Sequence, residues 1–193
     1  MGTVTSRSNV AQRKVVRWIW QATTPDEHVF DWQGMPFGRP GIVHWWNYGG
    51  LELKYLDGWY SLESEIRSAR VTLVIDNYRL HWMTPADTRF FNAHFVRFAP
   101  CLYAPGAFLP ASSFSDGSGV CEIFVPGLYR VLSGTPVRID GTLTAGTVQL
   151  ASGFHRIAVS RPTNVALYYT TAQRETSRPP CPSDDDALIK GFD

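Results

Sequence analysis

The second half of the chain consists of short apolar segments separated by glycine, proline and asparagine. Segments of this kind, rich in β-branched and aromatic residues, are typical of β-strands. The Asp140-Gly141 pair predicts a hairpin, because a type I′ turn requires positive φ at both central positions. We expect 137–139 to pair antiparallel with 142–144 across it. The strands of a small antiparallel β-sandwich are predicted over residues 120–125, 128–132, 137–143, 147–151, 155–160 and 165–170.

The first half of the chain has a different pattern, in which strands alternate with helices. Residues 71–76 are β-branched and almost wholly apolar, which is typical of a strand buried on both faces in a parallel sheet. Residues 29–31 predict a second strand, and we expect the two to share a sheet. With a last strand reaching about Tyr103, this order predicts a small β-α-β layer with right-handed crossovers.

Two helices of this layer are predicted from their N-terminal signals. Ser61 is a candidate N-cap for a helix over about 62–69. Thr84 is the N-cap candidate of the next helix, and Pro85 occupies its first position. The inner side of this second helix is predicted to carry Phe90, Phe91 and Phe95.

An amphipathic helix is also predicted near the start of the chain, over residues 13–21. The first twenty residues contain no acid, and their cations are Arg7, Arg13, Lys14 and Arg17. This charge fits either a solvated helix face or contact with an anionic membrane surface, and the solvated face is the favoured interpretation.

Together these patterns indicate an α+β fold, with a small β-α-β layer followed by an antiparallel β-sandwich. We expect residues 1–110 to form the layer, including a Trp-rich loop, and residues 111–173 to form the sandwich part. Residues 174–193 contain adjacent prolines and an acidic triplet, so they are expected to be an exposed tail.

Charge and hydropathy restrict the classes of partner and the cellular compartments that we expect for this chain. The 193 residues carry a formal net charge of +1, so we expect no nucleic-acid partner. No segment approaches the ~18 unbroken apolar residues of a membrane helix. The first residues also lack the apolar core of a signal peptide. On these grounds the chain is either cytosolic as written or part of a longer protein.

The three cysteines, Cys101, Cys121 and Cys181, lack the spacing of a zinc site. The favoured interpretation is two buried thiols and one thiol in the tail. In an oxidising compartment, the alternative is that Cys101 pairs with Cys121 across two strands and leaves Cys181 over.

The sequence provides no complete set of catalytic residues. Asp31 and Asp76 follow predicted strands, at the edge where open α/β sheets bind ligands, but capping and turn roles are favoured for them. The histidines have no metal-binding spacing, and no serine or cysteine has a nucleophile signature. We therefore expect no catalytic residue, no metal ligand and no cofactor.

The loop over residues 31–46 combines aromatic and cationic side chains. Aromatic planes stack on sugar rings or lie at a lipid headgroup boundary, and an arginine binds phosphate bidentately. The alternative is that the tryptophans fill the core beneath the loop. The candidate ligand-binding residues are Asp31, Arg39, His44, Trp45 and Trp46.

Residues 26–35, followed by Arg39-Pro40 and His44-Trp45-Trp46, resemble the soluble extracytoplasmic region of bacterial polytopic glycosyltransferases. These enzymes are similar to dolichyl-phosphate-mannose and lipid A aminoarabinose transferases. The resemblance continues through residues 66–67, 71–80, 91–95 and 103–106 and into hairpins near 126–131, 137–141 and 150–155.

In that family, membrane helices and the loops between them carry the acidic catalytic residues, and no such segment is found in these 193 residues. The resemblance therefore implies a non-catalytic periplasmic domain beside the membrane, without activity of its own. Its implied partners are the membrane-embedded remainder of a glycosyltransferase and a glycan or polyprenyl-phosphate sugar. The alternative is a stand-alone carbohydrate-binding β-sandwich module.

Overall fold

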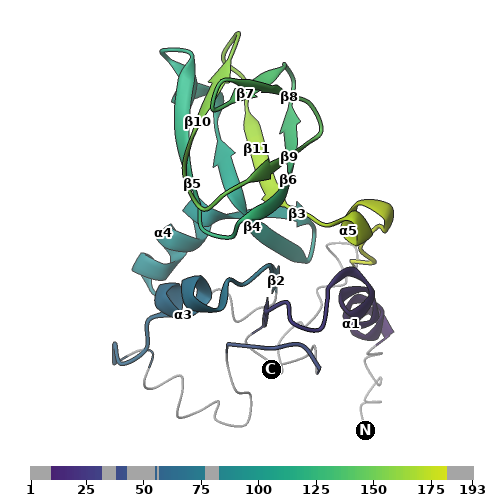
Figure 1. Cartoon of the computed structure of the whole chain (residues 1–193). Helices are drawn as coiled ribbons and strands as arrows, with labels where there is room; N and C mark the ends of the chain where they lie inside the picture. The colour runs from purple at the N-terminus through teal and green to yellow at the C-terminus, as the bar shows by residue number, and fades with distance from the viewer. Residues whose placement is uncertain (1–9, 32–37, 43–54, 56, 77–82, 182–193) are drawn as a thin grey trace, which may run out of the picture.

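The computed structural model describes residues 10–31, 38–42, 55, 57–76 and 83–181, and Figure 1 shows helices at one end and a β-sandwich at the other. The helices are α1 (Val10–Ala22), α3 (Leu62–Ala69), α4 (Pro85–His94) and α5 (Ala172–Thr176), with a short 3-10 helix, η3 (Ala111–Phe114). The strands are β1 (Val29–Phe30), β2 (Leu73–Ile75), β3 (Phe95–Ala99), β4 (Leu102–Leu109), β5 (Ser118–Ile123), β6 (Gly127–Ser133), β7 (Val137–Ile139), β8 (Thr142–Thr144), β9 (Thr147–Leu150), β10 (Gly153–Val159) and β11 (Val165–Tyr169). In the described part of the chain, no helix is long and apolar enough to cross a membrane.

The strands form two sheets, which confirms the α+β fold class. The larger sheet has the order β1-β2-β4-β11-β6-β9, with β3 paired to β4, and the smaller has the order β5-β10-β7-β8. β1 and β2 are parallel, with Val29 opposite Leu73 and Phe30 opposite Val74, so the predicted shared sheet is confirmed. The other described pairings are antiparallel.

β2 is buried on both faces because helices cover both sides of it. Val74 belongs to the apolar cluster formed with α3 and α4. Leu73 and Ile75 point the other way and belong to the cluster that contains Trp18 and Ile19 of α1. Alternate side chains of one short strand therefore join two helical layers.

The layer is mixed rather than wholly parallel, which corrects part of the sequence interpretation. β2 pairs antiparallel with β4 on the side opposite β1. Only residues 100–101 separate β3 from β4, and a connection this short allows only an antiparallel hairpin.

The predicted helix caps are confirmed. The Ser61 hydroxyl accepts a hydrogen bond from the Ser64 N–H at 3.2 Å. The Thr84 hydroxyl accepts one from the Asp87 N–H at 3.2 Å, and Pro85 begins α4. Phe90 and Phe91 are buried on α4 as predicted, whereas Phe95, predicted for the same helix, is buried as the first residue of β3.

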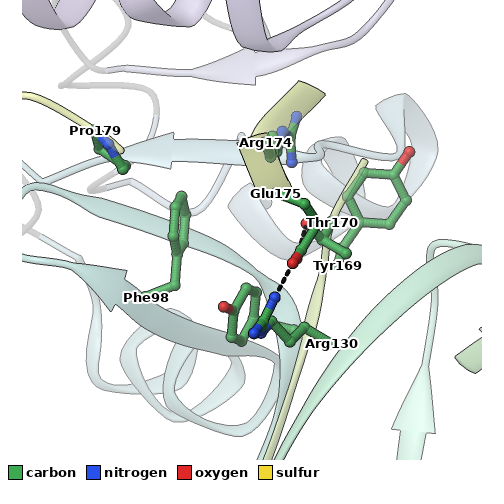
Figure 2. Close-up of a pocket in the computed structure, with 8 residues that line it drawn as sticks. Phe98, Arg130, Tyr169, Thr170, Arg174, Glu175 and Pro179 are labelled. Carbon is green, nitrogen blue, oxygen red and sulfur yellow. Dashed lines mark hydrogen bonds and ion pairs between the residues drawn. The ribbon is translucent and has the colours of Figure 1, made fainter. Parts of the chain in front are cut away.

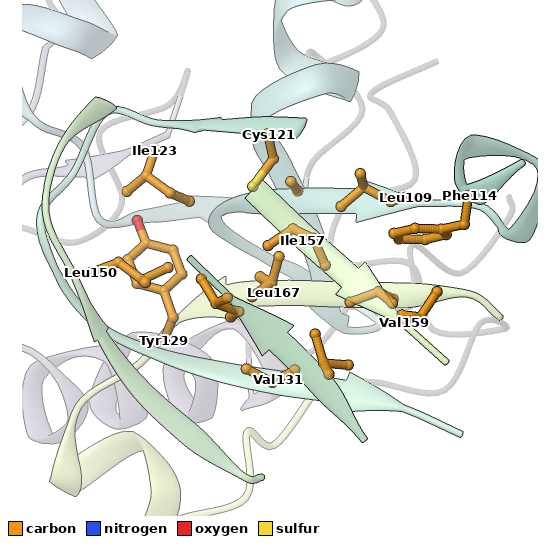
Figure 3. Close-up of a cluster of buried hydrophobic side chains, with 14 residues drawn as sticks. Leu109, Phe114, Cys121, Ile123, Tyr129, Val131, Leu150, Ile157, Val159 and Leu167 are labelled. Carbon is orange, nitrogen blue, oxygen red and sulfur yellow. The ribbon is translucent and has the colours of Figure 1, made fainter. Parts of the chain in front are cut away.

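The predicted hairpin is also confirmed. Asp140 and Gly141 have φ values of 50° and 84°, and Val137–Ile139 pairs antiparallel with Thr142–Thr144. Inward-facing side chains of both sheets fill the sandwich core shown in Figure 3, including Tyr129, Ile157 and Leu167.

β4 crosses the division that composition suggests near residue 110. Its first residues pair with β2 and β3, and residues 106–109 pair with β11 of the sandwich. At the crossing, a Cβ on Gly106 would lie 1.9 Å from the Leu167 carbonyl oxygen. The two backbones approach this closely because position 106 has no side chain.

An ion-pair cluster, which we call the clasp, fastens α3 to the sandwich. The Arg67 guanidinium donates to both carboxylate oxygens of Glu122 on β5, at 2.9 and 3.1 Å, and to Glu63 at 2.9 Å. It also lies 5.0 Å from the Phe90 ring centroid and 5.6 Å from that of Phe124. The Arg67 side chain therefore forms cation–π contacts and a bidentate ion pair at the same time.

Changing Glu122 to glutamine is expected to lower the free energy of unfolding at neutral pH by about 1–2 kcal/mol, because a charge-assisted bidentate pair is lost. Hydrogen bonds from Arg67 hold the pKa of Glu122 below its ordinary value of 4.5. This contribution is therefore full above about pH 4.5 and is lost as the pH falls further. Urea unfolding at neutral and acidic pH measures both effects.

The exposed Glu65→Gln change on α3 is the matched control, with an expected effect within about 0.5 kcal/mol. An identical acid-induced loss in the native chain and in Glu122→Gln would contradict the role of the clasp.

In the segment that composition predicts to be an exposed tail, Arg174 and Cys181 are bonded to the rest of the protein, whereas Glu175, Thr176 and Arg178 are exposed. Arg174 of α5 is only 7% exposed. Cys181 forms a disulfide with Cys101, and Cys121 is the buried free thiol. Both the favoured interpretation of three free thiols and the Cys101–Cys121 alternative are therefore wrong. Cys121 is on β5 and faces the sandwich core, whereas Cys101 is in the turn before β4 and packs with the α1 cluster. Residues 182–193 lie outside the described residues.

Candidate functional site

A pocket of about 160 Å³ opens where β3, β6, β11 and α5 meet (Figure 2). This volume is smaller than the roughly 300–1,000 Å³ of sites that enclose drug-sized ligands. It suits one small ring, or one unit of a longer ligand. The residues that line it are Phe98, Arg130, Tyr168, Tyr169, Thr170, Arg174, Glu175 and Pro179.

One wall of the pocket is aromatic. The Phe98 and Tyr168 rings stack with centroids 5.5 Å apart and planes inclined by 16°. Both residues are partly exposed, and burial raises the pKa of Tyr168. Strand alternation explains this placement, because Leu167 on the opposite face of β11 is fully buried in the sandwich core.

A second wall of the pocket is polar and charged. Arg130 lies opposite Tyr168 in the sheet and forms an ion pair with Glu175 of α5. The other Glu175 carboxylate oxygen accepts a hydrogen bond from the Thr170 hydroxyl at 2.8 Å. The Arg130 side chain remains 41% exposed, so its guanidinium is accessible to a ligand.

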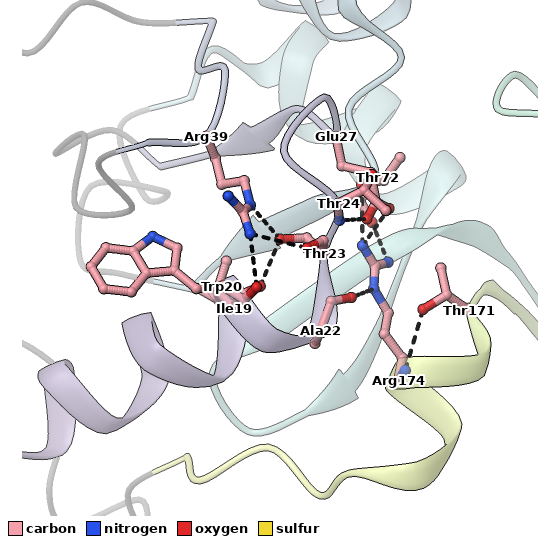
Figure 4. Close-up of polar contacts among 10 residues, drawn as sticks. All are labelled: Ile19, Trp20, Ala22, Thr23, Thr24, Glu27, Arg39, Thr72, Thr171 and Arg174. Atoms are coloured by element: carbon pink, nitrogen blue, oxygen red, sulfur yellow. Dashed lines mark hydrogen bonds and ion pairs between the residues drawn. The ribbon is translucent and has the colours of Figure 1, made fainter.

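Arg174 supports the pocket from the protein interior (Figure 4). Its guanidinium donates to the Ala22 and Thr72 carbonyls at 3.2 and 2.9 Å, and to the Glu27 carboxylate at 2.9 Å. It also lies 5.2 Å from the centroid of the Tyr169 ring. These contacts fix α5, and hence Glu175, against the layer.

The structure gives Arg39 a structural role at the end of α1 (Figure 4). The Arg39 Nε donates to the Thr23 hydroxyl at 2.8 Å, and Nη2 donates to the Trp20 and Thr23 carbonyls at 2.7 and 3.0 Å. A cation at this place satisfies carbonyls that have no partner within the helix. His44, Trp45 and Trp46 lie outside the described residues, so the ligand surface centred on this loop stays a prediction.

The two acids at the strand ends do not converge on the pocket. Asp31 is 4% exposed. Asp76 is paired with Arg97, with 3.1 Å between the Oδ2 and Nη2 atoms. Neither is among the residues that line the pocket.

Two histidines are held in polar contacts elsewhere. His155 Nδ1 lies 2.7 Å from the Asp140 carboxylate, and its Nε2 lies 3.0 Å from the Ala151 carbonyl. His94 is next to the clasp, where burial and the Arg67 charge lower its pKa. Across the described ranges, no three histidine, cysteine or acidic side chains are grouped as a metal site.

No pattern in the sequence marks the residues that line the pocket as a binding site. In the sequence, each of three pocket residues resembles an ordinary strand residue: Phe98, Arg130 and Tyr168. Glu175 lies in the segment that composition predicts to be a tail. They meet only because β11 pairs with β6 and α5 follows β11 directly. A pairing across tens of residues leaves no local motif.

Comparison with known proteins adds no family: no protein-family model, curated protein or solved structure matches this chain.

Proposed function

We propose that this chain is a non-catalytic, extracytoplasmic recognition domain that assists a membrane glycosyltransferase by holding a glycan or a lipid-linked sugar. The observation that carries the proposal is the pocket, where the stacked Phe98 and Tyr168 rings lie beside the Arg130–Glu175 pair. The described structure supports this pocket as the candidate binding site, in addition to the loop that contains Arg39.

The chemistry of the two walls matches that of a sugar ring. Aromatic faces pack against the apolar C–H faces of a sugar, and charged groups hydrogen-bond its hydroxyls. Arg130 adds the capacity to bind a phosphate, since a guanidinium presents parallel N–H donors. A sugar that carries a phosphate would use both walls at once.

The disulfide supports the proposed compartment. Cys101 and Cys181 are 80 residues apart and are bonded in the structure. Disulfides persist in oxidising compartments and are rare in the cytosol. This observation favours the extracytoplasmic alternative over the cytosolic one.

Two further observations favour binding over catalysis. The buried Asp31 is not presented to a substrate, and the Asp76 carboxylate is paired with Arg97. Glu175, the acid of the pocket, has both oxygens in contact with Arg130 and Thr170. A general base needs a carboxylate within reach of the substrate proton.

Neutral monosaccharides and sugar phosphates are expected to bind the pocket weakly, with Kd values on the order of 1 mM. Titration of the isotopically labelled chain, followed by NMR, should shift the signals of Tyr168 and Thr170. The Phe98→Leu change removes a stacking surface and should weaken binding up to about tenfold. The Arg130→Gln change should weaken binding of sugar phosphates more than that of neutral sugars.

Phe154→Leu is the matched control, since Phe154 is an aromatic residue of β10 with 76% exposure and lies outside the pocket. Its affinities should equal those of the native chain. Thermal unfolding checks that Phe98→Leu remains folded. The proposal fails if no sugar shifts the pocket signals, or if Phe98→Leu and Phe154→Leu bind alike.

A further inference from the structure

α1 has two faces of opposite character. One face packs against the protein: its buried residues follow helical spacing at positions i, i+3, i+4 and i+7. They are Val15, Trp18, Ile19 and Ala22. The other face is exposed, and its residues also follow helical spacing: Val10, Arg13, Lys14, Arg17, Trp20 and Gln21.

Every charged residue on the exposed face is a cation. Arg13, Lys14 and Arg17 are all exposed, and the helix contains no acid. Within the described part of the chain, none of the three forms an ion pair with a carboxylate. Their charge is therefore available to an external anionic partner.

Apolar side chains lie near both ends of this cationic strip. Val10 is 51% exposed and Trp20 is 47% exposed. A tryptophan near the end of a basic amphipathic helix suits the boundary between lipid headgroups and acyl chains. The exposed face as a whole is about 20 Å long, because α1 has 13 residues.

The orientation of this face is fixed by packing. The Trp18 indole N–H donates to the Ser177 hydroxyl after α5 at 3.0 Å. Arg39 holds the last carbonyls of α1. α1 lies at the end of the molecule away from the sandwich strands β7 and β8 (Figure 1).

We propose that the outer face of α1 docks on an anionic phospholipid surface, with Arg13, Lys14 and Arg17 on the headgroups and Trp20 at their boundary. The net charge of +1 on the whole chain gives no broad basic surface of the kind that nucleic acid requires. The inference goes beyond glycan recognition, because no residue of α1 lines the pocket, and either can fail without the other.

The test is flotation of the full 193-residue chain with lipid vesicles. One set contains phosphatidylcholine alone, and the other also contains about one third phosphatidylglycerol. We expect binding to the anionic vesicles, which weakens as salt is added. A triple variant, Arg13→Gln with Lys14→Gln and Arg17→Gln, should bind about a hundredfold more weakly, or about fivefold per cation.

A control triple variant removes the same charge elsewhere: Arg138→Gln, Arg156→Gln and Arg161→Gln. These arginines are exposed on the sandwich, and their loss should change vesicle binding by less than about threefold. Equal losses in the two triple variants would overturn the proposal, since net charge alone would then explain binding. It is also overturned if the native chain does not bind anionic vesicles, or if it binds duplex DNA more tightly than vesicles. Thermal unfolding of both variants verifies that each is folded.

Discussion

Replacing Arg174 by methionine is expected to lower the free energy of unfolding by about 3–5 kcal/mol, because one partner of a buried ion pair is removed. Arg174 is 7% exposed, and the paired Glu27 side chain is 11% exposed. The change leaves a carboxylate without its cation and leaves the Thr72 carbonyl without its donor. Methionine keeps much of the aliphatic volume, so the loss reports the polar contacts.

A double variant separates the charge from the hydrogen bonds. In Arg174→Met with Glu27→Gln, no uncompensated carboxylate remains, and about 1–2 kcal/mol should be recovered relative to Arg174→Met. Arg178→Met, at an exposed position of the same segment, is the control and should stay within about 0.5 kcal/mol of the native chain. Urea unfolding measures five proteins: the native chain, Arg174→Met, Glu27→Gln, the double variant and Arg178→Met. Additive effects of the two single changes would show that the pair is not coupled.

Reduction of the Cys101–Cys181 disulfide is expected to lower the free energy of unfolding by about 4.5 kcal/mol. The bond closes a loop with a sequence separation of 80 residues. In the chain-entropy model, breaking the bond restores conformational entropy to the unfolded chain, and this entropy favours unfolding by that amount of free energy. The comparison is urea unfolding with and without a reducing agent.

Cysteine variants test which two cysteines form the disulfide. Cys181→Ala should be as unstable as the reduced native chain and should not respond to the reducing agent. Cys121→Ala removes the buried free thiol, and it should still lose stability on reduction. If Cys121→Ala abolishes the response to reductant, the bonded pair includes Cys121 and the assignment is wrong.

The pairing also bears on the pocket. Pro179 lines the pocket two residues before Cys181, and α5 supplies Arg174 and Glu175. The disulfide and the buried arginine therefore hold the same segment at two points. Loss of either contact is therefore expected to make the pocket residues of this segment more mobile and to lower the stability of the fold.

The sequence alone determined the local elements. Ser61, Thr84-Pro85 and Asp140-Gly141 were predicted as caps and a turn, and each has that role in the structure. Such signals work because a side chain bonds the backbone a few residues away, or because a turn demands a particular φ. The almost wholly apolar run at 71–76 likewise indicated burial on both faces.

Only the tertiary structure decided how distant segments meet. It made β4 a member of both the layer and the sandwich, joined Cys101 to Cys181, and buried Arg174 in a segment whose composition is typical of a tail. It also placed Phe98 beside Tyr168 and Arg130 beside Glu175. Each outcome depends on packing and pairing between segments far apart in sequence, and a linear pattern of residue types does not specify which of them become neighbours.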